Sequence, residues 1–236
     1  MSKQDLRERI WDHLEAEGIA RFPFPPHDRI PNFAGAEDAA DRLTETDAWQ
    51  EAEAIKANPD APQLPVRRRA LREGKTVYMA VPRLRDEKPF YELDPAKIPV
   101  EEYDSAPTIS HVESYAQQVA PGDVATIDLV VSGSVAVTAA GARIGKGEGY
   151  SDLEYAILRE LGLVDGETPV ATTVHDSQVV DCEVAVESHD VAMNLVVTPT
   201  ETIRTGTDSA KPKGVFWDAL SDERVAEIPV LEARRP

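Results

Sequence analysis

The stretch best suited to chemistry is a glycine-spaced turn between residues 141 and 154, which reads G-A-R-I-G-K-G-E-G-Y-S-D-L-E. Gly145, Gly147 and Gly149 alternate with other residues, and glycine allows a positive φ and a close approach of the backbone to a ligand. A run rich in β-branched residues precedes the turn, and a helical pattern follows it. Unpaired N–H groups and the positive end of a helix dipole would then face one spot, which suits an anion such as phosphate.

The spacing of these glycines matches neither of two standard phosphate motifs. It is neither G-x-G-x-x-G nor G-x-x-x-x-G-K-S/T, so neither a dinucleotide fingerprint nor a Walker loop is supported. A plain tight connection between two elements is the alternative to phosphate binding. The pattern alone leaves both interpretations open.

Two further groups of polar residues are candidates for ligand binding. The loop at residues 21–33 contains four prolines and presents His27, Arg29 and Asn32, either to a ligand or as a strap over the core. The helical stretch at residues 66–72 holds four arginines, at 67, 68, 69 and 72. Such a cluster either meets phosphate or forms a solvated helix face.

The elements that must position these residues alternate between strands and helices. The hydrophobic periods predict helices at residues 2–17, 36–43, 47–53, 66–73 and 151–161, and strands at 54–57, 76–81, 127–131, 134–138, 170–174 and 195–197. Ser151 and Glu154 predict a capping box, and Phe90 with Tyr91 predicts a short edge strand. Strand, helix and strand between residues 54 and 81 make the βαβ unit of a parallel sheet, so we expect an α/β protein.

The length of 236 residues favours one large domain. We expect this α/β domain to span residues 1–203. Residues 204–236 would form a C-terminal extension, whose apolar stretches at 215–220 and 228–231 are suited to dock on the same domain.

The composition is strongly acidic, with 43 acidic and 25 basic residues and a formal charge of −18 at pH 7. The electrostatic field of such a negative charge repels phosphate-rich surfaces, so we expect neither nucleic acid nor membrane as a partner. For the oligomeric state, a monomer and a homodimer are both open. Acidity spread along a chain is typical of halophilic proteins, and an ordinary acidic cytosolic protein is the alternative. Cys182 is the only cysteine, which excludes an intrachain disulfide. Without an apolar signal segment, the protein is expected to be cytoplasmic.

The turn and the pieces around it resemble the 5-formyltetrahydrofolate cyclo-ligase family, also called methenyltetrahydrofolate synthetase. The stretch from Gly141 to Asp152 is similar to the family's G-x-R-L-G-x-G-x-G-Y-Y-D signature. Supporting pieces in the family's order are Lys3, Arg7, residues 71–82, Asp128 and residues 187–190, which resemble E-P-H-D. Residues 27–33, 82–84, 173–178 and 214–231 resemble a narrower branch, the methenyltetrahydrofolate synthetase domain-containing proteins. The RNA-binding extension that some of these carry is not among the 236 residues.

This resemblance implies a single three-layer α/β domain with a mainly parallel sheet, the NagB/RpiA-like fold of that family. It also implies an enzyme that closes a ring in 5-formyltetrahydrofolate, or in a related reduced pterin, at the expense of ATP. The formyl oxygen is phosphorylated, the N10 amine attacks the activated carbon, and phosphate departs to leave 5,10-methenyltetrahydrofolate. Phosphoryl transfer of this kind depends mainly on positioning and charge neutralisation.

The resemblance also assigns roles to individual residues. Arg143 and Lys146 would be catalytic. Lys3, Arg7, Gly145, Gly147, Gly149 and Tyr150 would bind ATP. Asp152 and Asp190 would hold Mg²⁺, which prefers hard oxygen ligands. His27, Arg29, Asn32 and Tyr150 would contact the folate or pterin substrate.

Four departures from the family pattern lie near the expected substrates. Glu148 places a negative charge inside the turn, where many members have Lys or Gly. Ser151 replaces a tyrosine, Thr138 stands where the family has aspartate, and residues 60–65 lack the family's acidic D-E-x-E run. A catalytically impaired folate- or nucleotide-binding regulatory protein of the same fold is therefore the first alternative. The second is an interaction module that binds protein through the loop at residues 27–33.

Overall fold

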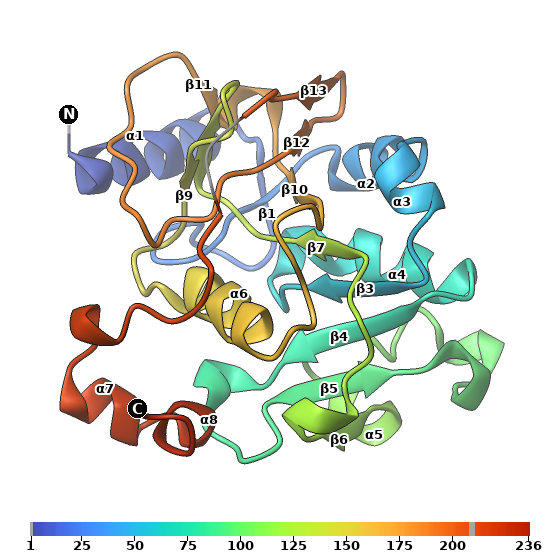
Figure 1. The fold of residues 1–236 in the computed structure, drawn as a ribbon. Helices are drawn as coiled ribbons and strands as arrows, with labels where there is room; N and C mark the ends of the chain where they lie inside the picture. Colours follow the sequence, from blue (N-terminus) through green and yellow to red (C-terminus); the bar gives the residue numbers. More distant parts are fainter. Residues whose placement is uncertain (1, 208–210) are drawn as a thin grey trace.

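A large, mostly parallel sheet organises the molecule in the computed structural model, which describes residues 2–207 and 211–236 (Figure 1). Within these residues eight strands form one sheet. Their spatial order is β13 (Thr202–Arg204), β12 (Leu195–Val197), β10 (Val170–Thr173), β7 (Leu129–Val131), β3 (Ala54–Ala57), β4 (Thr76–Ala80), β5 (Phe90–Leu93) and β6 (Gln117–Val119). The five strands from β12 to β4 run parallel, and β13, β5 and β6 are antiparallel to their neighbours.

The predicted βαβ unit is confirmed. It consists of β3, the helix α4 (Leu64–Arg72) and β4, and Ile55 lies opposite Val77 in a parallel register. Residues of both strands are almost fully buried because helices cover both faces of the sheet, which explains their continuous apolar runs.

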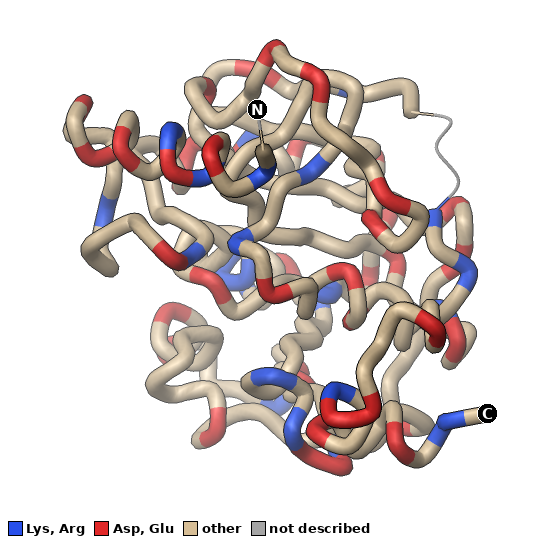
Figure 2. The backbone as a smooth tube through the Cα atoms, turned by 90° about the vertical axis from the view of Figure 1, so that its left-hand side faces the viewer, with Lys and Arg blue, Asp and Glu red and all other residues tan. Residues whose placement is uncertain are grey.

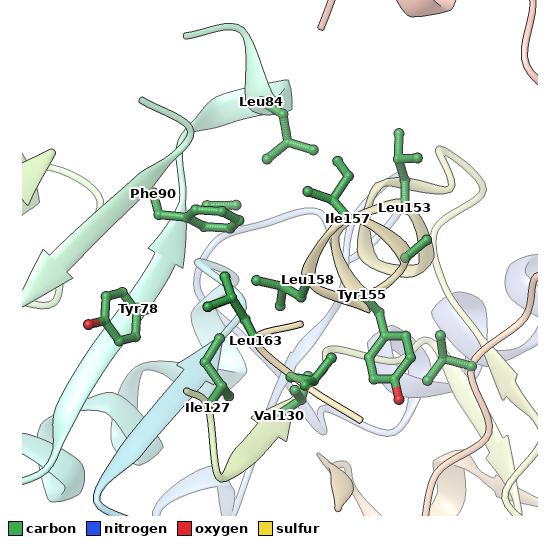
Figure 3. Close-up of a cluster of buried hydrophobic side chains, with 14 of the residues drawn as sticks. Tyr78, Leu84, Phe90, Ile127, Val130, Leu153, Tyr155, Ile157, Leu158 and Leu163 are labelled. Atoms are coloured by element: carbon green, nitrogen blue, oxygen red, sulfur yellow. The ribbon is translucent and has the colours of Figure 1, made fainter. Parts of the chain in front are cut away.

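Helices on the two faces make the fold a three-layer α/β structure, as expected. On one face α2 (Ala36–Thr44), α3 (Asp47–Gln50) and α4 pack against the sheet through Leu43, Trp49 and Leu71, while α5 (Val112–Tyr115) packs near β5. On the other face lies α6 (Tyr150–Glu160). Figure 3 shows Ile157 and Leu158 of α6 directed towards the side chains that project from that face.

A separate three-stranded sheet carries the glycine turn. It consists of β11 (Val179–Val180), β8 (Ala136–Thr138) and β9 (Arg143–Ile144), with α1 (Lys3–Ala16) packed on it. The strand predicted at residues 134–138 is thus present in shorter form but does not join the main sheet. The proline-rich loop closes through β1 (Ala20–Arg21) and β2 (Asn32–Phe33), which pair with each other.

Two local predictions are wrong. Ser151 does not cap α6, because the N-cap residue is Gly149, with φ of +70° and no side-chain hydrogen bond. Glu154 turns inward instead and forms an ion pair with Lys56. The stretch at Phe90 is not an edge strand either, since β5 lies between β4 and β6.

The arginines of α4 are partly structural and do not line the cleft described below. Arg67 is 1% exposed and donates to the main-chain carbonyls of Asn58, Pro59 and Pro107. Burial lowers the pKa of Arg67 to about 9. Arg69 binds Glu37 and Asp41 of α2. Neither the phosphate interpretation nor a fully solvated face describes this cluster.

The C-terminal residues pack on the same face of the sheet as α6. Of the extension expected at residues 204–236, residues 208–210 lie outside the described part, and the strand β13 crosses its predicted boundary. Two short helices follow, α7 (Asp222–Ala226) and α8 (Pro229–Glu232), which lie near α6 in Figure 1. Val225, Ile228 and Leu231 are buried in the same cluster as the apolar side chains of α6.

Acidic residues are spread over the molecule, as Figure 2 shows for one side, where they occur from end to end of the view. None of the helices among the described residues is long and apolar enough to cross a lipid bilayer.

Candidate functional site

A cleft of about 610 Å³ lies where the glycine turn and α6 face the carboxyl ends of β3 and β4. Its wall is built by segments distant in sequence, including α1, the residues after β3 and β4, the glycine turn and residues 187–190. In open α/β sheets ligands bind at the carboxyl ends of the parallel strands. The cleft is therefore the first candidate for a functional site.

The glycines of the turn have distinct structural roles. Gly147 and Gly149 have φ of +104° and +70°, which L side chains rarely adopt. A Cβ on Gly145 would lie 2.9 Å from Nη1 of Arg143, so a side chain there would displace the guanidinium. With Gly149 as N-cap, no side chain satisfies the first N–H groups of α6, which leaves the helix end suited to an anion.

Positive side chains from two elements converge on the turn. Lys3 and Arg7 lie one helical turn apart on α1, and Arg7 donates from Nε to the carbonyl of Gly145 at 2.7 Å. Burial and the neighbouring Arg143 lower the pKa of Arg7. Arg143 donates to the carbonyl of Gly133 at 2.9 Å and is 5% exposed. This concentration of positive charge in an acidic protein favours an anionic ligand.

The two predicted metal ligands line the same cleft and are neutralised by these cations. Asp152 accepts from Nη2 of Arg143 at 2.5 Å and from the main-chain N–H of Val191 at 3.1 Å. Asp190 accepts from Nζ of Lys3 at 2.9 Å. Burial raises the pKa of Asp190, but the N–H of Glu187 and the charge of Lys3 outweigh it, and the net shift is downward.

Glu148 lies within the turn as the sequence indicated. Its carboxylate forms an ion pair with Nζ of Lys146 at 2.7 Å, and both side chains are partly exposed. Lys146 is thus paired with a carboxylate of the same turn. Tyr150, also on the cleft wall, is partly buried, and its hydroxyl accepts from Arg224 at 2.7 Å.

The residues predicted to contact substrate from the proline-rich loop are not brought to the cleft. His27 binds Asp12 at 2.9 Å, and Asn32 donates to the carbonyl of Phe22 at 2.8 Å. Arg29 holds the indole of Trp11 through its carbonyl oxygen. Among the cleft-lining residues, Ile30 represents this loop. The loop packs on α1, and substrate contacts by His27, Arg29 and Asn32 stay a prediction.

A polar cluster on the cleft wall was missed from the sequence. Asn58, Asp60 and Glu154 line the cleft, and Lys56 lies behind them, 1% exposed and bonded to both Asn58 and Glu154. Burial raises the pKa of Asp60 more than the charges of Lys146, Arg67 and Lys56 lower it. Two features of the sequence could have indicated this cluster. Lys56 lies inside an apolar strand, and Glu154 lies on the apolar face of a helix.

The backbone at the opposite rim was also missed. Arg83, which lines the cleft, and Leu84 have φ of 58° and 55°, in the left-handed region that non-glycine residues rarely adopt. Such strain persists only where surrounding contacts enforce it and is common at ligand sites. Leu84 is fully buried and points towards α6 in Figure 3, which anchors this rim.

Three mammalian proteins are similar to the chain over its whole length. The chain is 45% identical to the methenyltetrahydrofolate synthase domain-containing protein of Mus musculus, 44% to that of Bos taurus and 41% to that of Homo sapiens, each over 237 residues. These matches cover 100% of this chain, which spans only 62% to 63% of the length of the three relatives.

The fold has a solved counterpart in the 5,10-methenyltetrahydrofolate synthetase of Aquifex aeolicus. The TM-score is 0.54 at 17% identity, over 87% of this chain and 94% of that one. The model of the 5-formyltetrahydrofolate cyclo-ligase family matches residues 1–199, which include every residue assigned above to the cleft wall. The chain therefore belongs to the 5-formyltetrahydrofolate cyclo-ligase family.

Proposed function

We propose that this chain catalyses the ATP- and Mg²⁺-dependent cyclisation of 5-formyltetrahydrofolate, or of a related reduced pterin, to 5,10-methenyltetrahydrofolate. The observation that carries the proposal is the convergence of Lys3, Arg7, Arg143 and Lys146 on a glycine turn at the start of α6. Family membership and the naming of the relatives point to the same reaction.

The triphosphate would lie along the glycine turn. Main-chain N–H groups of the turn and of the first turn of α6 would donate to phosphate oxygens, which the helix dipole also favours. Lys3 and Arg7 would neutralise the bound nucleotide. Arg143 and Lys146 would stabilise the charge on the phosphoryl group during transfer, because fixed charges in a partly closed site stabilise developing charge effectively.

The carboxylates fit Mg²⁺ that arrives with the nucleotide. Within the described residues no group of three or more His, Cys, Asp or Glu side chains could hold a metal by itself. Asp152 and Asp190 nevertheless present hard oxygen atoms beside the cationic turn, and Mg²⁺ is commonly held by one or two carboxylates, waters and substrate phosphates. When bound, the ion would neutralise phosphate charge.

The reaction then needs the two substrates held in line. The formyl oxygen attacks the γ-phosphorus as the bond to ADP breaks, which leaves an activated carbon bonded to the phosphorylated oxygen. N10 attacks this carbon, loses its proton, and the carbon–oxygen bond breaks to release phosphate. Asn58, Asp60 and Glu154 would offer polar groups to the pterin from the cleft wall, and Tyr150 would offer its ring. The chain's contribution is orientation and the removal of water from the activated carbon.

The direct test is turnover. Purified protein, in high and low salt, is incubated with 5-formyltetrahydrofolate, MgCl₂ and ATP, and the absorbance of the methenyl product is followed. We expect an ATP-dependent increase that Lys146→Ala reduces strongly and that Lys88→Ala, at an exposed lysine that does not line the cleft, leaves unchanged. No ATP-dependent increase with the wild-type protein would exclude the proposed reaction.

One observation favours a second candidate, a regulatory folate- or nucleotide-binding protein without turnover. Glu148 forms an ion pair with Lys146 at 2.7 Å, so the positive charge of the turn is partly neutralised before any ligand binds. This candidate expects a thermal shift with ATP or with 5-formyltetrahydrofolate but no methenyl product. The turnover assay and the thermal-shift measurement together therefore distinguish the two functions.

A further inference from the structure

The C-terminal segment, residues 211–236, runs beside α6 and contacts both of its ends. At the carboxyl end of α6, Oε1 of Glu160 accepts from the N–H of Val215 at 3.0 Å and from Nε1 of Trp217 at 3.2 Å. At the amino end, Arg224 of α7 reaches the glycine turn. Between them Val225 and Ile228 are buried against the same core as α6. The segment is therefore fixed along the helix whose start forms the candidate phosphate site.

Arg224 makes three contacts on the turn. Its Nη1 donates to the hydroxyl of Tyr150 at 2.7 Å, and its Nη2 donates to the main-chain carbonyl of Glu148 at 3.1 Å. Its guanidinium carbon also lies 4.0 Å from the centre of the Tyr150 ring, as in a cation–π contact. The planar fork of arginine allows donation in two directions while it stacks, which lysine cannot reproduce. The side chain is 26% exposed.

These contacts hold the two residues on either side of Gly149. Gly147 and Gly149 both have positive φ, and glycine loses more conformational freedom on ordering than any other residue. Because α6 has no side-chain N-cap, no capping bond fixes this end of the helix. Arg224, which belongs to α7, restrains this end of the helix. It binds the main-chain carbonyl of Glu148, one residue before Gly149, and the side chain of Tyr150, one residue after it.

A second contact joins the segment to the other side of the cleft. Phe216 packs edge-on against His189, with ring centres 6.4 Å apart, and His189 lines the cleft beside Asp190. The match to the family model ends at residue 199, so both Phe216 and Arg224 lie beyond it. The matches to the three mammalian relatives include this segment, because they cover the whole chain.

We propose that Arg224 is a positioning residue of the phosphate site, and that the C-terminal segment completes this site by holding the glycine turn in its binding conformation. The expected consequence is tighter ATP binding, and this consequence rests on the proposed function. Arg224 does not line the cleft and is not assigned a contact with the nucleotide.

The decisive measurement is hydrogen exchange of the ligand-free protein. In Arg224→Ala and Arg224→Lys, amides of residues 153–155, which are the first hydrogen-bonded amides of α6 and begin with Leu153 donating to Gly149, should exchange about tenfold faster than in the wild type. Arg235→Ala is the matched control, because Arg235 makes an exposed ion pair with Asp222 of the same helix. Unchanged exchange of these helix-start amides in both Arg224 variants overturns the inference.

Kinetics provide the second arm. If the protein turns over, Arg224→Lys should raise KM for ATP about five- to tenfold, while the fluorescence of Trp217, a reporter of segment docking, stays near wild type. Faster exchange with an unchanged KM for ATP would overturn the positioning role. A wild-type protein that neither binds nor turns over ATP would end the proposed function, and hydrogen exchange would still decide whether Arg224 holds the turn.

Discussion

Arg143 and Asp152 stand on opposite sides of the glycine turn and are joined by an ion pair of 2.5 Å that is almost closed to solvent, with side-chain exposures of 5% and 13%. The pair fixes the strand before the turn to the first turn of α6. It also places a carboxylate and a guanidinium, the two kinds of group that Mg²⁺ and phosphate require, at the same point of the cleft.

Asp152→Asn tests the metal role of that carboxylate. The amide keeps the shape but loses the charge, so we expect Mg²⁺-dependent ATP affinity, measured calorimetrically with and without MgCl₂, to fall at least about tenfold. Asp123→Asn, at an exposed aspartate outside the cleft, should bind as the wild type does. If Asp152→Asn keeps the full effect of Mg²⁺ on ATP affinity, Asp152 is not a metal ligand.

Glu148→Lys tests whether the turn is electrostatically tuned away from nucleotide. The exposed pair with Lys146 is worth at most about 1 kcal/mol, so its loss together with the added charge should raise ATP affinity by up to about tenfold at low salt. The gain should shrink as salt increases, because the charges are partly exposed. Glu45→Lys, at the C-cap of α2 and not on the cleft wall, controls for net charge. Equal affinity gains in both variants would show that the position has no special role.

The buried pair of Lys56 and Glu154 gives a prediction on stability. Glu154→Leu leaves the Lys56 charge without its partner and should destabilise the fold by about 3–5 kcal/mol in urea unfolding. The double variant Lys56→Met with Glu154→Leu should recover most of that loss, since neither charge of the pair is then present. A double variant no more stable than Glu154→Leu would show that the pair does not act as a unit.

Gly141→Ala should destabilise the fold because its environment excludes a side chain. Gly141 has φ of +90°, and an added Cβ would lie 2.3 Å from the carbonyl oxygen of Met193. We expect a loss of about 1–3 kcal/mol in the free energy of unfolding. Gly122→Ala meets open space and should change stability by less than about 0.5 kcal/mol. Similar losses in both variants would contradict the steric argument.

Asp60 predicts a specific pH dependence. Burial raises its pKa, so the folded chain holds the proton more tightly than the unfolded chain, in which the pKa is about 3.9. The stability contribution is thus greatest below that value and is lost as the pH rises through the folded pKa. In Asp60→Asn this loss is absent, and the unfolding free energy relative to wild type should increase from acidic to neutral pH.

A second aspartate provides the opposite sign. Bonds from the N–H and hydroxyl of Thr168 lower the pKa of Asp165, so its contribution is present above the unfolded pKa and is lost in acid. The stability of Asp165→Asn relative to wild type should therefore decrease from acidic to neutral pH. A flat or falling curve for Asp60→Asn relative to wild type would show that the pKa of Asp60 is not raised.

The sequence by itself determined the α/β class, most element positions and the family, because these depend on local information. Apolar runs at β3, β4 and β10 mark strands buried on both faces, and the glycine spacing marks a turn that other residues cannot form.

The tertiary structure alone decided which polar side chains share the cleft. Ser151 looked like a cap and Glu154 like its partner, yet Lys56, 98 residues away, drew Glu154 inward because an unpaired buried lysine is costly. The same holds for His27, which follows its loop onto α1, and for Arg224, whose partners Glu148 and Tyr150 lie more than 70 positions earlier in the chain. Contacts between distant segments arise from packing, and no local pattern encodes them.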